Sequence, residues 1–167
     1  MSQFKLLLVD DSHNILKSLK RVFLSEGYDI HFADSAENAL KVLNVEPIDL
    51  IITDENMPGT SGTDLLIRIK DLYPEIIRIM ITGASDIEVA MKAINAGQIY
   101  RFFTKPWNDF DLLLAVRYAL KEKALKIENK ELKKVIKSQQ CILEKLEDEH
   151  PGIGEIKVDE EGCIIIN

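Results

Sequence analysis

Apolar runs and stretches with helical spacing alternate along the first 120 residues of the chain. Five apolar runs bounded by polar or turn residues predict strands at 4–9, 28–33, 48–53, 76–82 and 99–104. Between the runs, apolar residues recur every three or four positions, as on one face of a helix. This alternation predicts an α/β fold with a parallel sheet. The third and fourth runs are apolar on both faces, which predicts a doubly wound sheet with helices on both sides.

Capping residues and prolines mark the predicted element boundaries. We expect helix N-caps at Ser35 (with Asn38), at Thr60 and at Ser85–Asp86, because short polar side chains accept the free backbone N–H groups of a helix start. Prolines interrupt helices and strands, and Pro47, Pro58, Pro74 and Pro106 all fall between elements.

The last predicted helix is unusually long. It begins near Asn108–Asp109 and meets no helix breaker before Pro151, which corresponds to roughly 60 Å at 1.5 Å per residue. An apolar stripe with seven-residue spacing follows it, interrupted by polar residues at 128 and 139; the stripe is Leu125, Leu132, Val135, Gln139, Ile142 and Leu146. Such a heptad pattern predicts a coiled-coil homodimer. The alternative, an amphipathic helix packed on its own domain, is less favoured because the stripe continues past the α/β unit.

We therefore expect three segments: an α/β domain at 1–120, a helical coiled-coil linker at 121–150, and the start of a following domain or a tail at 151–167. Residues 154–167 have the pattern of a strand, a turn at Glu161–Gly162 and a second strand, and the chain ends at Asn167 within the apolar run "CIII". Because exposed apolar strands promote aggregation, we expect this chain to be part of a longer protein.

Charge and composition exclude several classes of protein. The 167 residues carry a net charge of −7 and the pI is near 5.0, which argues against a nucleic-acid surface in this chain. No apolar stretch reaches the ~20 residues of a membrane span, and the N-terminus lacks a signal-peptide pattern. Cys141 and Cys163 form neither a disulfide framework nor a metal-binding pair. We expect a soluble cytoplasmic protein with reduced thiols.

Polar residues follow four of the five predicted strands. Asp10 and Asp11 follow the first strand, Asp54 the third, Thr82 ends the fourth, and Lys105 follows the fifth. In doubly wound sheets ligands bind beyond the carboxyl ends of the strands, so these side chains are expected to meet there. Neighbouring carboxylates resist joint ionisation, which predicts a cation among them.

Hard oxygen ligands of this kind suit Mg²⁺. With a bound Mg²⁺, Asp54 is a candidate nucleophile that forms an acyl phosphate, while Thr82 and Lys105 hold phosphoryl oxygens. Each residue also has a structural interpretation: Asp11 with Ser12 as a helix cap, Asp54 as a turn residue, and Lys105 as a surface charge. The shared position at strand ends favours the chemical interpretation over these.

The motifs "VDDS", "TDENMPGTSG", "ITG" and "FFTKPW", in this order, resemble the receiver domain of two-component response regulators over about residues 4–120. The resemblance implies a flavodoxin-like, five-stranded parallel sheet, here with a long C-terminal helix. It implies that Asp54 is the phosphoacceptor and that Asp10, Asp11 and Asp54 with the backbone carbonyl of Asn56 hold Mg²⁺. It implies that Thr82 is the switch hydroxyl and Lys105 the lysine that senses the phosphoryl group. It also implies a cis Lys105–Pro106 peptide and a switch aromatic at Phe102, where family members often carry Tyr.

The function implied is that of a signalling module. A sensor histidine kinase or a phosphotransfer protein would donate a phosphoryl group to Asp54, and the protein would catalyse only its own phosphorylation and dephosphorylation. The change would pass through the face made by the fourth helix, fifth strand and fifth helix into the dimeric helix and an output domain. The stretch 95–120 looks more like receivers joined to phosphohydrolase-type outputs than to DNA-binding ones, and residues 151–167 look like the opening strands of a PAS-type sensory domain.

Two other functions remain open. A Mg²⁺-dependent phosphatase would use Asp54 as nucleophile, but the usual general acid two residues later is Asn56 here, which disfavours that reading. A dimerisation adaptor that is never phosphorylated is disfavoured by the complete acidic set. His13 lacks a partner His or Cys and is not expected to bind metal.

Overall fold

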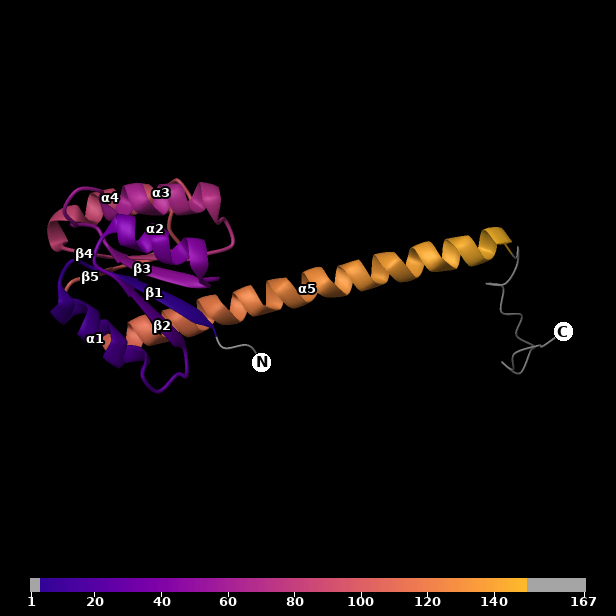
Figure 1. Cartoon of the computed structure of the whole chain (residues 1–167), viewed down its shortest axis with the longest axis horizontal. Helices are drawn as coiled ribbons and strands as arrows, with labels where there is room; N and C mark the ends of the chain where they lie inside the picture. Colours follow the sequence, from indigo (N-terminus) through magenta and orange to yellow (C-terminus); the bar gives the residue numbers. More distant parts are fainter. Residues whose placement is uncertain (1–3, 150–167) are drawn as a thin grey trace. The chain divides into compact units, whose positions relative to one another are not determined.

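The computed structural model describes residues 4–149 as a doubly wound α/β domain that ends in a long helix (Figure 1). The predicted order of strands and helices is confirmed. In chain order the elements are β1 (Lys5–Val9), α1 (His13–Phe23), β2 (Asp29–Ala33), α2 (Ala36–Val45), β3 (Leu50–Asp54), α3 (Gly62–Leu72), β4 (Ile77–Thr82), the 3₁₀ turn η1 (Ala84–Asp86), α4 (Ile87–Asn95), β5 (Arg101–Thr104) and α5 (Asp109–Glu149).

All strand pairs in the sheet are parallel, and the strand order is β2-β1-β3-β4-β5. β2 lies on one side of β1, and β3 lies on the other side. The topological switch point is therefore between β1 and β3. Ligands of doubly wound sheets bind at this point, beyond the carboxyl ends of the strands. The register pairs Val9 with Thr53 and Asp54 with Ile81, which brings the ends of three strands to one edge.

Helices cover both faces of the sheet, as the apolar patterns of β3 and β4 predict. Alternate residues of β1 and β3 belong to two different cores: Leu7 and Ile51 pack with α2, α3 and α4, whereas Leu8 and Ile52 pack with α1 and the first turns of α5. Figure 1 shows α2, α3 and α4 together on one side of the sheet and α1 on the other. β3 is buried along its whole length, including its last residue, Asp54.

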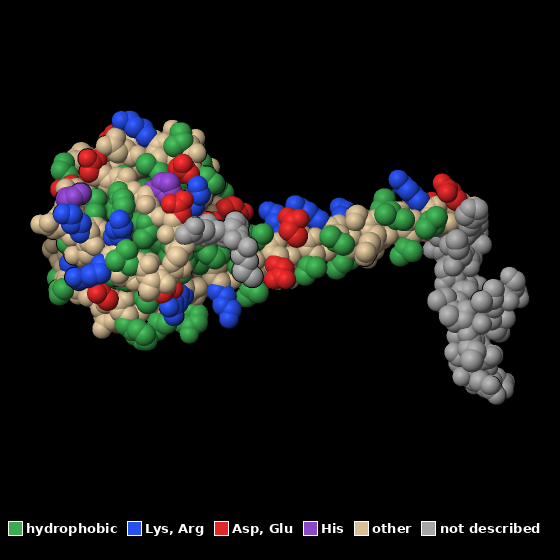
Figure 2. Space-filling model, turned by 60° about the horizontal axis from the view of Figure 1, so that its bottom comes forward, with side chains coloured by type: hydrophobic (Ala, Val, Ile, Leu, Met, Phe, Trp, Pro, Cys, Tyr) green, Lys and Arg blue, Asp and Glu red, His purple; other side chains and the backbone are tan. Residues whose placement is uncertain are grey.

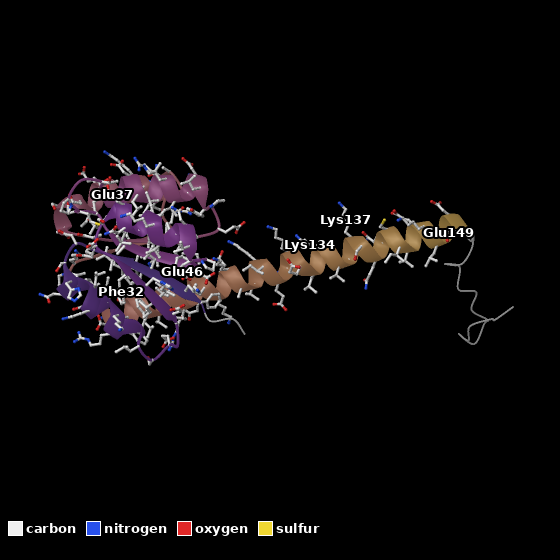
Figure 3. All side chains as sticks on the ribbon, viewed as in Figure 1. Phe32, Glu37, Glu46, Lys134, Lys137 and Glu149 are labelled. Atoms are coloured by element: carbon white, nitrogen blue, oxygen red, sulfur yellow. The ribbon has the colours of Figure 1, made fainter. Side chains whose placement is uncertain are left out.

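The N-cap positions agree with prediction at α2 and α4 and differ at α3. The hydroxyl of Ser35 accepts the backbone N–H of Asn38, as expected. At α3 the N-cap is Ser61 and not Thr60, because the Thr60 hydroxyl instead donates to Glu37 on α2, which Figure 3 labels. Asp86 stands at the N-cap position of α4, but its carboxylate makes no capping bond there.

Helix α5 runs without a break from Asp109 to Glu149, and the chain divides into two units after Lys121. Before the division, α5 buries Leu112, Val116 and Leu120 in the core shared with α1. After it, apolar side chains including Leu132 and Ile142 are exposed. Figure 2 shows hydrophobic and charged side chains interspersed along the helix. None of the helices in the described part of the chain is long and apolar enough to cross a membrane.

The segment predicted to begin a following domain or a tail, 151–167, lies outside the described residues. The proposed resemblance to a PAS-type domain and the predicted three-segment division at 120 and 150 therefore stay predictions.

Candidate functional site

Three carboxylates meet at the carboxyl ends of β1 and β3. Asp10 and Asp11 follow β1 and Asp54 ends β3, and one carboxylate oxygen from each lies within 4.8 Å of the others. Asp10 and Asp54 are buried, whereas Asp11 is exposed. They converge because β1 and β3 are adjacent parallel strands that end at the same level.

Lys105 supplies the positive charge that the carboxylates require. Its ammonium nitrogen lies 3.0 Å from Oδ1 of Asp54 and 3.1 Å from Oδ2 of Asp10. The backbone N–H of Lys105 donates to the carbonyl of Thr82 at 2.8 Å, which continues the pairing of β4 with β5. The peptide between Lys105 and Pro106 is cis, as the resemblance to receivers implied.

The pKa values at this cluster show competition between burial and charge. Burial raises the pKa of Asp54, and the negative charge of Asp10 adds to this, while the bond from Lys105 offsets only part of the increase. For Lys105, burial alone would lower the pKa, but its bonds to Asp54 and Asp10 outweigh burial, and the pKa is raised. Lys105 is therefore a cation at neutral pH, and a further cation would relieve the remaining repulsion at Asp54.

Asp10 also anchors the first helix. Its second oxygen, Oδ1, accepts the backbone N–H of Ser12 at 2.8 Å, at the start of α1. Ser12 itself makes no side-chain capping bond. The side-chain cap that the sequence offers at Ser12 is therefore not formed, and Asp11 stays exposed at the cluster.

Thr82 and Asn56 complete the edge of the site. Thr82 is fully buried at the end of β4, and its hydroxyl is 3.4 Å from the carbonyl of Gly83. The side-chain amide of Asn56 donates to Oδ2 of Asp86 at 2.7 Å, which joins the loop after β3 to η1. The predicted phosphoryl contacts therefore lie at the carboxyl ends of β3, β4 and β5, which are neighbours in the sheet.

The structure does not bring every predicted residue into the carboxylate cluster. Phe102 pairs with Met80 in the sheet, before the strand ends, and its half-buried ring packs against the core under α2, α3 and α4. The apolar stripe on α5 lies in the unit after Lys121. The switch and dimer roles of these residues stay proposals.

Sequence reasoning assigned no role at the site to two carboxylates beside it, Glu55 and Asp86. Glu55 follows Asp54 directly and is buried; its Oε2 accepts both the backbone N–H and the hydroxyl of Thr63, each at 2.8 Å. Burial raises the pKa of Glu55 although the two Thr63 bonds oppose the increase. An available signal was the position of Glu55 directly after a buried strand, because buried charged residues are almost always paired.

The donor set suits a small hard cation. Three carboxylates offer only oxygen ligands, and Mg²⁺ is held by one or more carboxylates at about 2.1 Å while keeping several waters. The exposed Asp11 leaves the cluster open on one side, where waters and an incoming anionic group have access.

Comparison with known proteins agrees with this geometry. The model of the "Response regulator receiver domain" family matches residues 6–117. The curated relatives include the response regulator protein TodT of Pseudomonas putida, 38% identical over 68% of this chain, and the hydrogenase transcriptional regulatory protein HoxA of Cupriavidus necator, 33% identical over 74%. The chain spans 50% of the length of TodT and 25% of that of HoxA.

Among solved structures, the signal receiver domain of an HD domain-containing protein from Pseudomonas fluorescens Pf-5 is similar at 41% identity, with a TM-score of 0.70. The similarity covers 74% of this chain and 98% of that domain. Similarity therefore extends over the α/β unit, and the similar proteins include a transcriptional regulatory protein and an HD domain-containing protein.

Proposed function

The chain belongs to the response regulator receiver domain family, and on this premise we propose that it is a phosphoacceptor receiver in which Asp54 accepts a phosphoryl group. The observation that supports this most directly is the meeting of Asp54 with Asp10, Asp11 and Lys105 at one strand edge. The donor would be a sensor histidine kinase or a phosphotransfer protein, as the family implies.

The transfer is an attack by one oxygen of the Asp54 carboxylate on phosphorus. An O–P bond forms, the P–N bond of the donor phosphohistidine breaks, and the leaving imidazole nitrogen keeps the electron pair and takes a proton from water. The product is an acyl phosphate on Asp54. Burial raises the pKa of Asp54 and so disfavours its ionised form, which is the nucleophile. A cation close to the carboxylate favours the ionised form.

The chain's own residues can orient the phosphoryl group after transfer. Lys105 reaches Asp54 already, so its ammonium can shift to a phosphoryl oxygen without leaving the site. The hydroxyl of Thr82 makes only a 3.4 Å contact with Gly83, a weak bond that it can exchange for a phosphoryl oxygen. Asp10, Asp11, Asp54 and the backbone carbonyl of Asn56 are the proposed holders of Mg²⁺, which when bound would neutralise the carboxylates and the transferring oxygens.

Output would pass through α4, β5 and α5. Exposed apolar residues mark this part of the surface: Met91 on α4, Tyr100 before β5 and Tyr118 on α5. A shift of Thr82 toward the phosphoryl group would change the packing of Phe102 on β5, a local charge change coupled to a two-state element. Because α5 continues to Glu149, the change could reach a dimer formed by the apolar stripe and an output domain beyond it.

Intact mass spectrometry after incubation with acetyl phosphate tests the proposal. The wild-type protein should gain one phosphoryl group only with Mg²⁺, and hydroxylamine should remove it, since hydroxylamine cleaves acyl phosphates. Asp54→Asn should gain nothing, whereas Asp71→Asn, an exposed carboxylate on α3, should behave like wild type. A folded wild-type protein that binds Mg²⁺ but forms no adduct would contradict the proposal and favour a dimerisation adaptor.

A further inference from the structure

Glu55, the residue after the proposed phosphoacceptor, has every polar group engaged with a neighbouring element. Its N–H donates to the carbonyl of Ile81 on β4 at 3.2 Å, and its carbonyl accepts the N–H of Gly62 at 3.0 Å. Its carboxylate accepts both donors of Thr63 in the first turn of α3. Glu55 thus connects the end of β3 to β4 on one side and to the start of α3 on the other.

The first residue of α3 lies directly against the peptide bond between Asp54 and Glu55. A Cβ on Gly62 would come within 2.1 Å of the Asp54 carbonyl oxygen and 2.9 Å of the Glu55 Cα, distances that no side chain can occupy. The Asp54 carbonyl also accepts the hydroxyl of Thr53 at 3.1 Å. The backbone that carries the Asp54 side chain is therefore enclosed by α3 and held by hydrogen bonds.

A carboxylate at this buried position carries a desolvation cost. Three other carboxylates lie at the same strand edge, and an apolar side chain after a buried strand would avoid the desolvation cost. Glu55 is compensated by the two Thr63 bonds and by the positive end of the α3 dipole, to which an acidic residue in this place is complementary. Ser61 caps α3 separately, through the N–H of Asp64, so the Glu55 bonds can be removed without removing that cap.

We propose that Glu55 and Thr63 form a positioning pair that fixes the backbone from Asp54 to Asn56 in the geometry needed for Mg²⁺ binding and phosphoryl transfer. The inference rests on the proposed function of Asp54. Rotation of the Glu55 peptide would move the Asp54 carboxylate and the Asn56 carbonyl together, and displacements of about 1 Å are costly for metal ligands and reacting groups. Glu55 acts through its neighbours and touches neither the metal nor the phosphoryl group.

Four variants separate positioning from helix stability. Glu55→Ala removes the acceptor, Thr63→Val removes one donor while keeping the side-chain shape, and Thr63→Ser keeps the hydroxyl. Ser61→Ala is the matched control, because it removes a cap of the same helix that is not connected to β3. Each full-length variant is measured for thermal stability, for Mg²⁺ affinity by calorimetry, and for amide hydrogen exchange of residues 54–64 without metal.

Glu55→Ala should weaken Mg²⁺ binding about 10- to 100-fold and Thr63→Val about 3- to 10-fold, the range found when groups that orient metal ligands are removed. Both should speed amide exchange between Asp54 and Thr63. Thr63→Ser and Ser61→Ala should keep Mg²⁺ affinity within about twofold of wild type, even where Ser61→Ala lowers the melting temperature as much as Thr63→Val.

Mg²⁺ affinity that stays within twofold of wild type in Thr63→Val and in any folded Glu55→Ala overturns the positioning role. An equal loss of affinity in Ser61→Ala overturns it as well, because the effect would then follow helix stability. The initial rate of acyl phosphate formation should fall in parallel with affinity at low Mg²⁺. Absence of an acyl phosphate in the wild-type protein would refute the proposed function instead. The Mg²⁺ affinities of the variants would still test the positioning role of Glu55 and Thr63.

Discussion

The ammonium nitrogen of Lys105 lies 3.0 Å from Oδ1 of Asp54, across the intervening strand β4. The side chain starts beyond β5 and reaches the end of β3, where it also contacts Asp10. A cation is thus built into the protein at the place where a metal ion and a phosphoryl group would bind. The metal-free state is stabilised by this lysine, and a bound divalent cation would share the same carboxylates.

Replacement of Lys105 tests whether this lysine and a divalent cation share the carboxylates of Asp10 and Asp54. In Lys105→Met, Asp10 and Asp54 face each other without their cation, which should lower the free energy of unfolding of the metal-free protein by about 1–3 kcal/mol. The same variant should be stabilised more by Mg²⁺ than wild type, because the ion meets unpaired carboxylates and binds only the native state. Melting temperatures over a Mg²⁺ series measure both effects, with Lys92→Met on the exposed face of α4 as control. Equal Mg²⁺ stabilisation of variant and wild type would contradict the expectation.

Gly62 should tolerate no side chain. Gly62→Ala places a Cβ 2.1 Å from the Asp54 carbonyl oxygen, so α3 or the end of β3 must move. We expect a loss of stability of about 2–4 kcal/mol, typical of overpacking against a fixed backbone, and a reduced rate of acyl phosphate formation. Gly83→Ala is the matched control at the other loop of the site, because its nearest contacts would be 3.7 Å away and ordinary. Urea denaturation compares the two, and similar losses would show that the close approach is not the cause.

Acid should break the ion pair between Glu26 and Arg117. The Arg117 guanidinium contacts both Glu26 oxygens, at 2.5 and 2.6 Å, and these bonds hold the pKa of Glu26 below its ordinary value of 4.5. A pKa lowered in the folded state means that the stabilisation is complete above pH 4.5 and is lost as the pH falls through the folded pKa. Arg117→Gln should therefore be less stable than wild type at neutral pH, and the difference should shrink below pH 4.5.

Thermal unfolding at several pH values measures that difference, and Arg21→Gln, an exposed arginine on α1, is the control. A difference between wild type and Arg117→Gln that stays constant down to strongly acidic pH would mean that Arg117 stabilises the protein through packing rather than charge.

The apolar stripe on α5 should mediate formation of a homodimer. Leu132→Ser and Ile142→Ser each remove an exposed apolar side chain at a predicted interface position, so each should weaken a dimer about 10- to 100-fold, given ~1.5–3 kcal/mol per buried aliphatic side chain. Ile127→Ser is the matched control: it is exposed to a similar degree (50%, against 54% for Leu132) but lies off the stripe. Sedimentation velocity over a concentration series distinguishes the variants, and an equal effect of Ile127→Ser would remove the case for a specific coiled coil.

Most of the fold could be predicted from the sequence because its signals are local. Alternating apolar runs and helical spacings predicted the five strands and the order of helices, and the two-sided apolar character of β3 predicted cover on both faces. The placement of Asp10, Asp54 and Lys105 at one edge also followed, since parallel strands all end on the same side of a sheet. The cis peptide before Pro106 was expected only from the resemblance to receivers.

The N-cap residue of α3 does not follow from the local sequence. Thr60 and Ser61 are adjacent hydroxyl residues before the helix, and either satisfies the capping pattern. The choice depends on Glu37, because this residue of α2 accepts the Thr60 hydroxyl and leaves Ser61 to bind the N–H of Asp64.

The sequence by itself determined the strand-helix order, the doubly wound sheet and the set of charged residues at the strand ends, since periodicity and strand direction are properties of the chain. Tertiary structure alone decided the partners of individual side chains. Glu55 meets Thr63, and Asn56 meets Asp86, because the turn into α3 and the packing of α4 beside it bring these residues within hydrogen-bond distance. No spacing rule encodes such pairs, because they depend on how separate elements pack on one sheet.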